Sequence, residues 1–131
     1  MKPTNDKVFW DTNVLVYCYD KNQSERKVKA QTLSFEVPEI MISTQVLNEL
    51  AFVLSKKQGL DWDKVTDVLQ EVSQNFTIHT NTAETIIKAT NIAKKYQFSF
   101  YDSLIISAAL ISGCNFYIPK ICTTASLLKT G

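Results

Sequence analysis

Hydrophobic and polar positions alternate along the chain in blocks that predict a regular succession of short strands and helices. Short β-prone runs stand at residues 7–10 (KVFW), 39–42 (EIMI), 76–79 (FTIH) and 115–118 (NFYI). Between and around them, apolar residues at helical spacing predict helices over residues 13–19, 24–37, 45–57, 62–73, 83–96 and 103–112. No repeat or linker interrupts this order. We therefore predict an α/β fold in which a short, mainly parallel sheet is flanked by helices.

The composition is typical of one compact domain with a sizeable core. The chain has 131 residues, of which 45% are hydrophobic, and only three prolines and three glycines. The helix at residues 103–112 (SLIISAALIS) is apolar almost all round, so we expect it to be buried. Residues 1–131 are therefore interpreted as a single domain.

The charge balance neither requires nor excludes a nucleic-acid partner. Lys and Arg total 14 and Asp and Glu total 13, so no global positive field attracts phosphate. Binding of RNA must then use a local patch, for which the candidates are Lys56, Lys57, Lys94 and Lys95. Runs of this kind are most often solvated helix faces.

Cysteine usage and hydropathy indicate a cytoplasmic protein. Cys18, Cys114 and Cys122 are odd in number, widely spaced and without the CxxC spacing of zinc sites, which favours free thiols in a reducing compartment. The sequence MKPTNDK has no apolar run of the signal-peptide kind, and no later stretch reaches the ~18 residues that span a bilayer. We expect no membrane association.

Two large classes of catalytic site are excluded by residue type. The single histidine, His79, lies in a predicted strand, and no serine elbow or cysteine-protease signature accompanies it, which argues against a nucleophilic triad. Gly59, Gly113 and Gly131 are too far apart to build a phosphate loop or a dinucleotide-binding turn.

Three carboxylates remain, each near a junction between a strand and a helix. Asp11 ends the first strand, Glu49 lies in the early turns of the helix after the second strand, and Asp102 heads the apolar helix. Strand carboxyl ends and helix N-termini form the usual crevice of an open α/β sheet, so Asp11 and Asp102 are expected to meet there. Each acid lies beside apolar residues, and a buried carboxylate needs a cation, a proton or a metal. Hard oxygen ligands indicate Mg²⁺ or Mn²⁺.

The same residues also suit purely structural roles. Asp11 and Asp102 are of a residue type that caps helices, and Glu49 can be a solvated residue at the edge of an apolar face. For any one of them alone, the structural role is the simpler interpretation. The recurrence of an acid at three junctions leaves metal binding and helix capping as open alternatives.

Three segments resemble the successive signature segments of PIN domains, specifically of VapC-type toxins. They are WDTNVLVY (residues 10–17), STQVLNELAFVL (43–54) and FSFYDSLIISAAL (98–110). They occur in the family's order and span the chain to Cys114, which is far more specific than a lone DTN. The resemblance implies a three-layer PIN-like fold and a Mg²⁺- or Mn²⁺-dependent endoribonuclease. Such toxins are often homodimers and are inhibited by a VapB-like antitoxin encoded beside them.

The resemblance also implies roles for particular residues. By position, Asp11, Glu49 and Asp102 correspond to the catalytic, metal-ligating acids of the family. Asn13 and Ser43 correspond to polar positions that commonly support the site, and both also suit helix caps. The substrate implied is RNA, cut by hydrolysis of its phosphodiester bonds.

The end of the chain departs from the family pattern. PIN domains usually carry another acid just after the last helix, in a strand and turn resembling LYSEDM, whereas this chain reads NFYIPKICTTASLLKTG and has no acid after Asp102. Codons can be chosen for residues 117–131 whose shifted frame reads YSEDMHHGLIIENR, which resembles the family's ending. The shift amounts to an extra TA within a TATAT stretch. Residues 118–131 are therefore interpreted, as a hypothesis, as an out-of-frame tail.

Three interpretations of the function stay open. In the first, Asp11, Glu49 and Asp102 bind metal and cut RNA. In the second, the missing acid leaves a catalytically impaired PIN domain that binds only an antitoxin or nucleic acid. In the third, the acids are helix caps.

Overall fold

The computed structural model describes residues 7–19, 25–36, 39–114, 116–118 and 128–129. Over these ranges the strands are β1 (Lys7–Trp10), β2 (Glu39–Ser43), β3 (Thr77–His79), β4 (Phe116–Ile118) and β5 (Leu128–Lys129). The helices are α1 (Thr12–Cys18), α2 (Glu25–Glu36), α3 (Thr44–Lys56), α4 (Trp62–Asn75), α5 (Ala83–Tyr96) and α6 (Phe100–Ile111).

The strands form one mainly parallel sheet in the order β3-β2-β1-β4-β5. Strand β1 is central and pairs in parallel with β2 and β4, so that Val8 lies opposite Ile40 on one side and Phe116 on the other. Strand β3 extends the parallel part beyond β2, and β5 pairs antiparallel with β4. Parallel neighbours end at the same edge of the sheet, and this edge carries the starts of α1 and α3.

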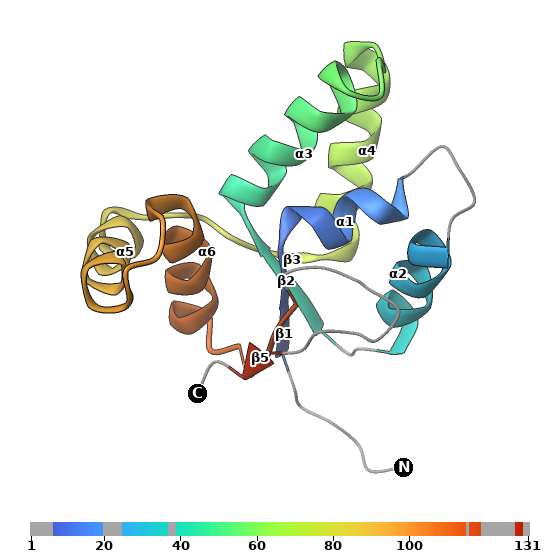
Figure 1. Ribbon diagram of the computed structural model, residues 1–131. Helices are drawn as coiled ribbons and strands as arrows, with labels where there is room; N and C mark the ends of the chain where they lie inside the picture. The colour runs from blue at the N-terminus through green and yellow to red at the C-terminus, as the bar shows by residue number, and fades with distance from the viewer. Residues whose placement is uncertain (1–6, 20–24, 37–38, 115, 119–127, 130–131) are drawn as a thin grey trace.

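Helices cover both faces of the sheet (Figure 1). Helices α1 and α2 lie on one side, α5 and α6 lie side by side on the other, and the pair α3–α4 rises beyond the strand ends. This arrangement confirms the predicted fold of a short, mainly parallel sheet flanked by helices.

The core joins β1 and β2 to the inner faces of the helices. Phe9, Trp10 and Ile42 are fully buried, and the ring of Trp10 lies 5.5 Å from that of Phe76 between centroids. Burial of side chains of this size contributes roughly 1.5–3 kcal/mol each. Because Trp10 directly precedes Asp11, the packing of this residue holds the start of the candidate site in place.

Helix α6 is largely buried from Ser103 onward, as its apolar sequence predicts, whereas its first turn is exposed. Six of its residues are buried: Ser103, Leu104, Ile105, Ser107, Ala108 and Ala109. The hydroxyl of Ser107 donates a 2.8 Å hydrogen bond to the backbone carbonyl of Thr85, which ties α6 to α5. Small residues permit this close approach of the two helices.

Two features of the last third of the chain differ from the sequence prediction. Helix α6 begins at Phe100 and not at Ser103, because the hydroxyl of Ser99 accepts a hydrogen bond from the backbone amide of Asp102 at 3.1 Å and caps the helix earlier. Strand β5 was not predicted, since a two-residue strand has no detectable periodicity and exists only through its pairing with β4.

Several sequence-based expectations fall on residues that the structure does not describe. Ser24 and Pro38 at the ends of the second helix, the third cysteine Cys122, and most of the tail at residues 118–131 lie outside the described residues. In the described part of the chain, no helix has both the length and the apolar character that crossing a membrane requires.

Candidate active site

A cavity of about 500 Å³ opens beyond the end of β1, between α1, α3 and α6. All three candidate acids line it, each from a different element: Asp11 from the turn after β1, Glu49 from α3 and Asp102 from α6. The tertiary structure thus brings together three carboxylates that are far apart in the sequence. The apolar part of the wall includes Phe52, Val53 and Ile105.

Asp11 is the N-cap residue of α1. Its backbone is extended, with φ −75° and ψ 163°, and its carboxylate Oδ1 accepts a 2.6 Å hydrogen bond from the amide of Thr12. The cap orients the carboxylate at the helix N-terminus, where the exposed backbone amides and the helix dipole favour negative charge. For Asp11, capping and lining of the cavity therefore occur together and are not alternatives.

Asp102 lies inside the first turn of α6 and is not its cap. Ser99 holds the cap position, so the interpretation of Asp102 as the residue that heads the helix is wrong by three residues. The carboxylate of Asp102 is exposed and forms part of the cavity wall. The dipole of α6 stabilises an acid in its first turn, as the dipole of α1 does for Asp11.

Glu49 is held by a neighbour that the sequence analysis missed. The amide nitrogen Nε2 of Gln45 donates a hydrogen bond to Oε1 of Glu49 at 3.0 Å and lies 3.5 Å from the backbone carbonyl of Tyr101. Gln45 is buried and therefore fixes Glu49 relative to α6. The sequence does contain a signal for this contact, because Gln45 and Glu49 are four residues apart and therefore share one face of the helix.

The three acids are less buried than the sequence suggested. Glu49 and Asp102 are exposed and Asp11 is half-buried. The prediction that these carboxylates are buried, and therefore need a partner, is wrong. The reason is that the side chains border an open cavity at the edge of the sheet and do not point into the core. Water can therefore solvate them.

The two residues expected to support the site have different positions. Asn13 is exposed and lines the cavity beside Asp11. Ser43 is fully buried and lies outside the cavity wall, where its hydroxyl accepts a 3.4 Å hydrogen bond from the amide of Val46 as the N-cap of α3. Ser43 thus acts on the start of the helix that carries Gln45 and Glu49.

The chemistry of the wall suits a hard divalent cation, although its acids do not converge on one point. Within the described ranges, no three Asp, Glu, His or Cys side chains are close enough to share an ion. Two buried oxygen atoms of the cavity residues, Thr12 Oγ1 and Gln45 Oε1, have no hydrogen-bond partner among the described residues. Buried polar atoms without partners are costly, so they favour a bound polar ligand. Carboxylates with hydroxyl and amide oxygens fit Mg²⁺ or Mn²⁺.

The sequence pattern of the PIN domain family matches residues 8–122, which is most of the chain. The chain belongs to the PIN domain family. No sequence among the curated proteins is significantly similar to this PIN domain.

Solved structures share the fold of this PIN domain at low sequence identity. The Mycobacterium tuberculosis toxin VapC20, described as cleaving the sarcin-ricin loop, has a TM-score of 0.73 and 18% identity, over 88% of this chain and 91% of that one. A toxin-antitoxin complex from Klebsiella pneumoniae has a TM-score of 0.66 and 17% identity, over 88% of each chain. The DNA-bound VapBC2 complex of Rickettsia felis has a TM-score of 0.61 and 20% identity, over 82% and 83%. The PIN domain thus has the fold of VapC toxins.

One of the four candidate lysines borders the cavity that the three acids line, which we call the acidic cavity. Lys57, at the C-terminal end of α3, lines the cavity with the acids. Lys56, Lys94 and Lys95 are exposed and do not line it. A cation beside carboxylates is suited to a phosphate that approaches the acids, because it offsets the repulsion between them.

The single histidine of the PIN domain lies outside this cavity. The ring nitrogen Nε2 of His79 is 2.9 Å from the hydroxyl of Thr85, and partial burial lowers the pKa of His79. A lowered pKa keeps the imidazole neutral at physiological pH, which suits a structural bond between β3 and α5.

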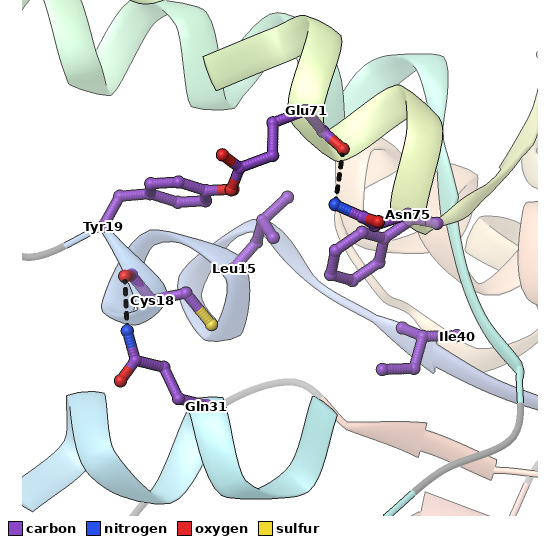
Figure 2. A pocket seen from close by; sticks show the side chains of 8 residues that line it. Leu15, Cys18, Tyr19, Gln31, Ile40, Glu71 and Asn75 are labelled. Carbon is purple, nitrogen blue, oxygen red and sulfur yellow. Dashed lines mark hydrogen bonds between the residues drawn. The ribbon is translucent and has the colours of Figure 1, made fainter. Parts of the chain in front are cut away.

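A second cavity, of about 640 Å³, lies between α1, α2 and α4 (Figure 2). Leu15, Ile40 and Phe76 form its apolar part. At its edge, the hydroxyl of Tyr19 donates a 2.8 Å hydrogen bond to Oε1 of Glu71, and burial together with this bond raises the pKa of Tyr19. The acidic and the second cavities share no lining residue.

Proposed function

We propose that this PIN domain is a Mg²⁺- or Mn²⁺-dependent endoribonuclease and the toxin of a toxin–antitoxin pair. The observation that carries the proposal is the single cavity lined by Asp11, Glu49 and Asp102 in a member of the PIN family. The likeness to VapC20 supports RNA as the substrate class, since that toxin is described as cleaving the sarcin-ricin loop.

In the proposed site, Asp11, Glu49 and Asp102 would hold the cation partly through bound water, because Mg²⁺ keeps several waters and contacts only one or two carboxylates directly. A divalent ion there would supply positive charge that lowers the pKa of a water and stabilises the charge that develops on the phosphate. Asp11 is oriented by the amide of Thr12, and Glu49 by Gln45. Asn13 would support the site from the cavity wall, and Ser43 by capping α3.

Two further residues, Lys57 and Gln45, would also have roles in the site. Lys57 would bind a non-bridging oxygen of the RNA phosphate, because it is a cation on the cavity wall. Gln45 would keep Glu49 and the start of α6 at a constant separation, because its amide bridges the two. No protein nucleophile is needed, since water is the attacking group in metal-assisted hydrolysis.

The proposed partners are a VapB-like antitoxin and a second copy of the chain. The structures from Klebsiella pneumoniae and Rickettsia felis are a toxin–antitoxin complex and a VapBC2 complex, and this likeness supports an antitoxin partner. The homodimer, the cytoplasmic location and the single domain at residues 1–131 stay predictions from the sequence.

The test is cleavage of RNA with and without Mn²⁺ by the parent protein and by Asp11→Asn. Asparagine caps helices as well as aspartate does, so this variant keeps α1 and removes only the charged ligand. We expect a loss of Mn²⁺-dependent cleavage of about 100-fold or more. Asp67→Asn is the matched control, because Asp67 is an exposed acid on α4 outside both cavities, and its cleavage should equal that of the parent.

The proposed binding of metal by the three acids is tested separately, by calorimetry of Mn²⁺ binding. Glu49→Gln and Asp102→Asn should each weaken Mn²⁺ binding by about tenfold or more in calorimetry, since each removes a charged oxygen ligand. If all three acid variants bind Mn²⁺ as the parent does, the acids serve as caps and surface residues, and the proposal is wrong.

A second function is favoured by one observation, the lack of any acid after Asp102. A PIN domain without its last acid would retain the fold while binding only an antitoxin or nucleic acid. The parent protein would then show no metal-dependent cleavage, and a version with an acidic tail restored would show it.

A further inference from the structure

The turn between α5 and α6 exposes a strip of aromatic residues next to lysines. The segment at residues 94–101 reads KKYQFSFY, and from residue 86 to residue 101 the chain contains three lysines and no acid. Tyr96 is 53% exposed, Phe98 46% and Tyr101 69%. Large aromatic residues are not normally left in water in such a row, so the strip calls for a ligand.

Local geometry arranges the rings of this strip. Gln97 adopts a left-handed backbone with φ 61°, which reverses the chain after α5 and places Tyr96 and Phe98 side by side. Their rings are stacked, 5.6 Å apart between centroids and 17° from parallel. The ammonium group of Lys95 lies 5.2 Å from the centroid of the Tyr96 ring. A stacked aromatic pair and a cation are thus adjacent on the surface.

The strip meets the acidic cavity at Tyr101. Phe100 and Tyr101 follow in the first turn of α6, with ring centroids 5.8 Å apart in an edge-to-face arrangement. Tyr101 also lines the cavity that holds Asp11, Glu49 and Asp102. A flexible chain bound along the strip can therefore continue into the cavity.

We propose that Tyr96, Phe98, Phe100 and Tyr101, with Lys94 and Lys95, form a binding surface for single-stranded RNA that feeds the acidic cavity. Bases stack on the aromatic rings and phosphates pair with the lysines, which is how proteins bind single strands without reading sequence. The choice of RNA rests on the proposed ribonuclease function. A second copy of the chain fits less well, because lysine is depleted in protein interfaces and a two-fold contact would bring like charges together.

Binding is measured by fluorescence anisotropy of a labelled oligouridylate of about 12 nucleotides, with EDTA present so that no metal-dependent cleavage occurs. We expect Phe98→Ala and Tyr96→Ala each to weaken binding about tenfold, whereas Tyr96→Phe, which keeps the ring, binds as the parent does. Trp62→Ala is the control, because Trp62 is 66% exposed on α4, away from the strip, and its loss should change nothing.

The contribution of the lysines is measured separately, from the way in which RNA affinity depends on salt concentration. The double variant Lys94→Ala/Lys95→Ala should make the plot of log K for RNA binding against log salt concentration less steep by about 1.4. Each phosphate contact on a single strand contributes about 0.7 to the steepness of this plot. The aromatic variants should leave this slope unchanged. An unchanged slope in the double variant would overturn the role of the two lysines.

The experiment separates this inference from the proposed function. RNA binding that depends on Tyr96 and Phe98 supports the inference even if the parent protein cleaves nothing. Cleavage by the parent together with unchanged RNA affinity of Tyr96→Ala and Phe98→Ala overturns the inference and leaves the ribonuclease function standing. Sedimentation of the same variants measures self-association. Loss of self-association with unchanged RNA affinity would identify the strip as a dimer contact and would also overturn the inference.

Discussion

The amide of Gln45 donates a 3.0 Å hydrogen bond to the carboxylate of Glu49, one helical turn away on α3. Gln45 is buried and its nitrogen also faces the carbonyl of Tyr101, so the position of an exposed acid is set by a residue packed between two helices. An ordered carboxylate can bind a cation with less loss of side-chain entropy than a freely rotating one.

Gln45→Leu should keep the volume of the side chain and remove the hydrogen bond to Glu49. We expect Mn²⁺ affinity and RNA cleavage to fall by about 10- to 100-fold, as is usual when a residue that orients a metal ligand is lost. Calorimetry measures the affinity. Gln74→Leu, at an exposed position of α4, is the control. Equal Mn²⁺ affinity in the two variants would show that Glu49 needs no positioning.

Two buried serines on α6 should differ in their contribution to stability. The hydroxyl of Ser107 bonds the carbonyl of Thr85 at 2.8 Å, whereas that of Ser103 has no partner among the described residues. Ser107→Ala should therefore lower the free energy of unfolding by about 1 kcal/mol. Ser103→Ala should leave it unchanged or raise it, because a buried hydroxyl without a partner is removed. Urea unfolding of both variants is the measurement, and an equal loss in both would contradict the assignment.

Stability should decline in alkaline solution because of a buried thiol. Burial raises the pKa of Cys114 from its usual 9.0 to about 11, with Glu39 adding to the shift and Lys7 opposing it. The folded chain thus binds the proton more tightly than the unfolded chain. The resulting stabilisation is complete below pH 9 and is lost as pH rises from 9 to 11.

The slope from this one thiol is at most about 1.4 kcal/mol per pH unit. Cys114→Ala should reduce the decline measured by urea unfolding over this pH range, although it lowers stability at neutral pH by removing a buried group. Burial also raises the pKa of Cys18 to about 11, so part of the decline should remain in the variant. An identical pH profile for the variant and the parent would exclude Cys114 as a source.

The origin of the tail can be read from the gene. The DNA for residues 117–131 should contain a TATAT-like stretch followed by codons that spell YSEDMHHGLIIENR when an extra TA is removed. Other codons would refute the frame hypothesis. If the DNA agrees, removing the extra bases restores acids after Asp102, which should tighten Mn²⁺ binding and raise cleavage, because another carboxylate strengthens a site for a hard cation. Equal cleavage by both forms would mean that the missing acid has no role.

Local sequence determined the elements and their order. The periodicity of apolar residues and the capping residues predict the four strands of the parallel part and all six helices of the described chain, because these signals act over a few residues. The burial of α6 from Ser103 onward was also evident, since a helical segment that is apolar almost all round has no solvent face. The three candidate acids were found by their positions at strand–helix junctions and by their match to family motifs.

Only the tertiary structure decided how these acids are placed and what surrounds them. Asp11, Glu49 and Asp102 line one cavity because parallel strands end at a common edge and because α6 borders the same cavity as α3, a relationship between segments far apart in sequence. The exposure of Glu49, the contact of Gln45 with both Glu49 and α6, and the stacking of Tyr96 on Phe98 likewise depend on which surfaces meet. Periodicity assigns a residue to a face of its own helix, whereas the neighbour of that face is set by packing of the whole chain.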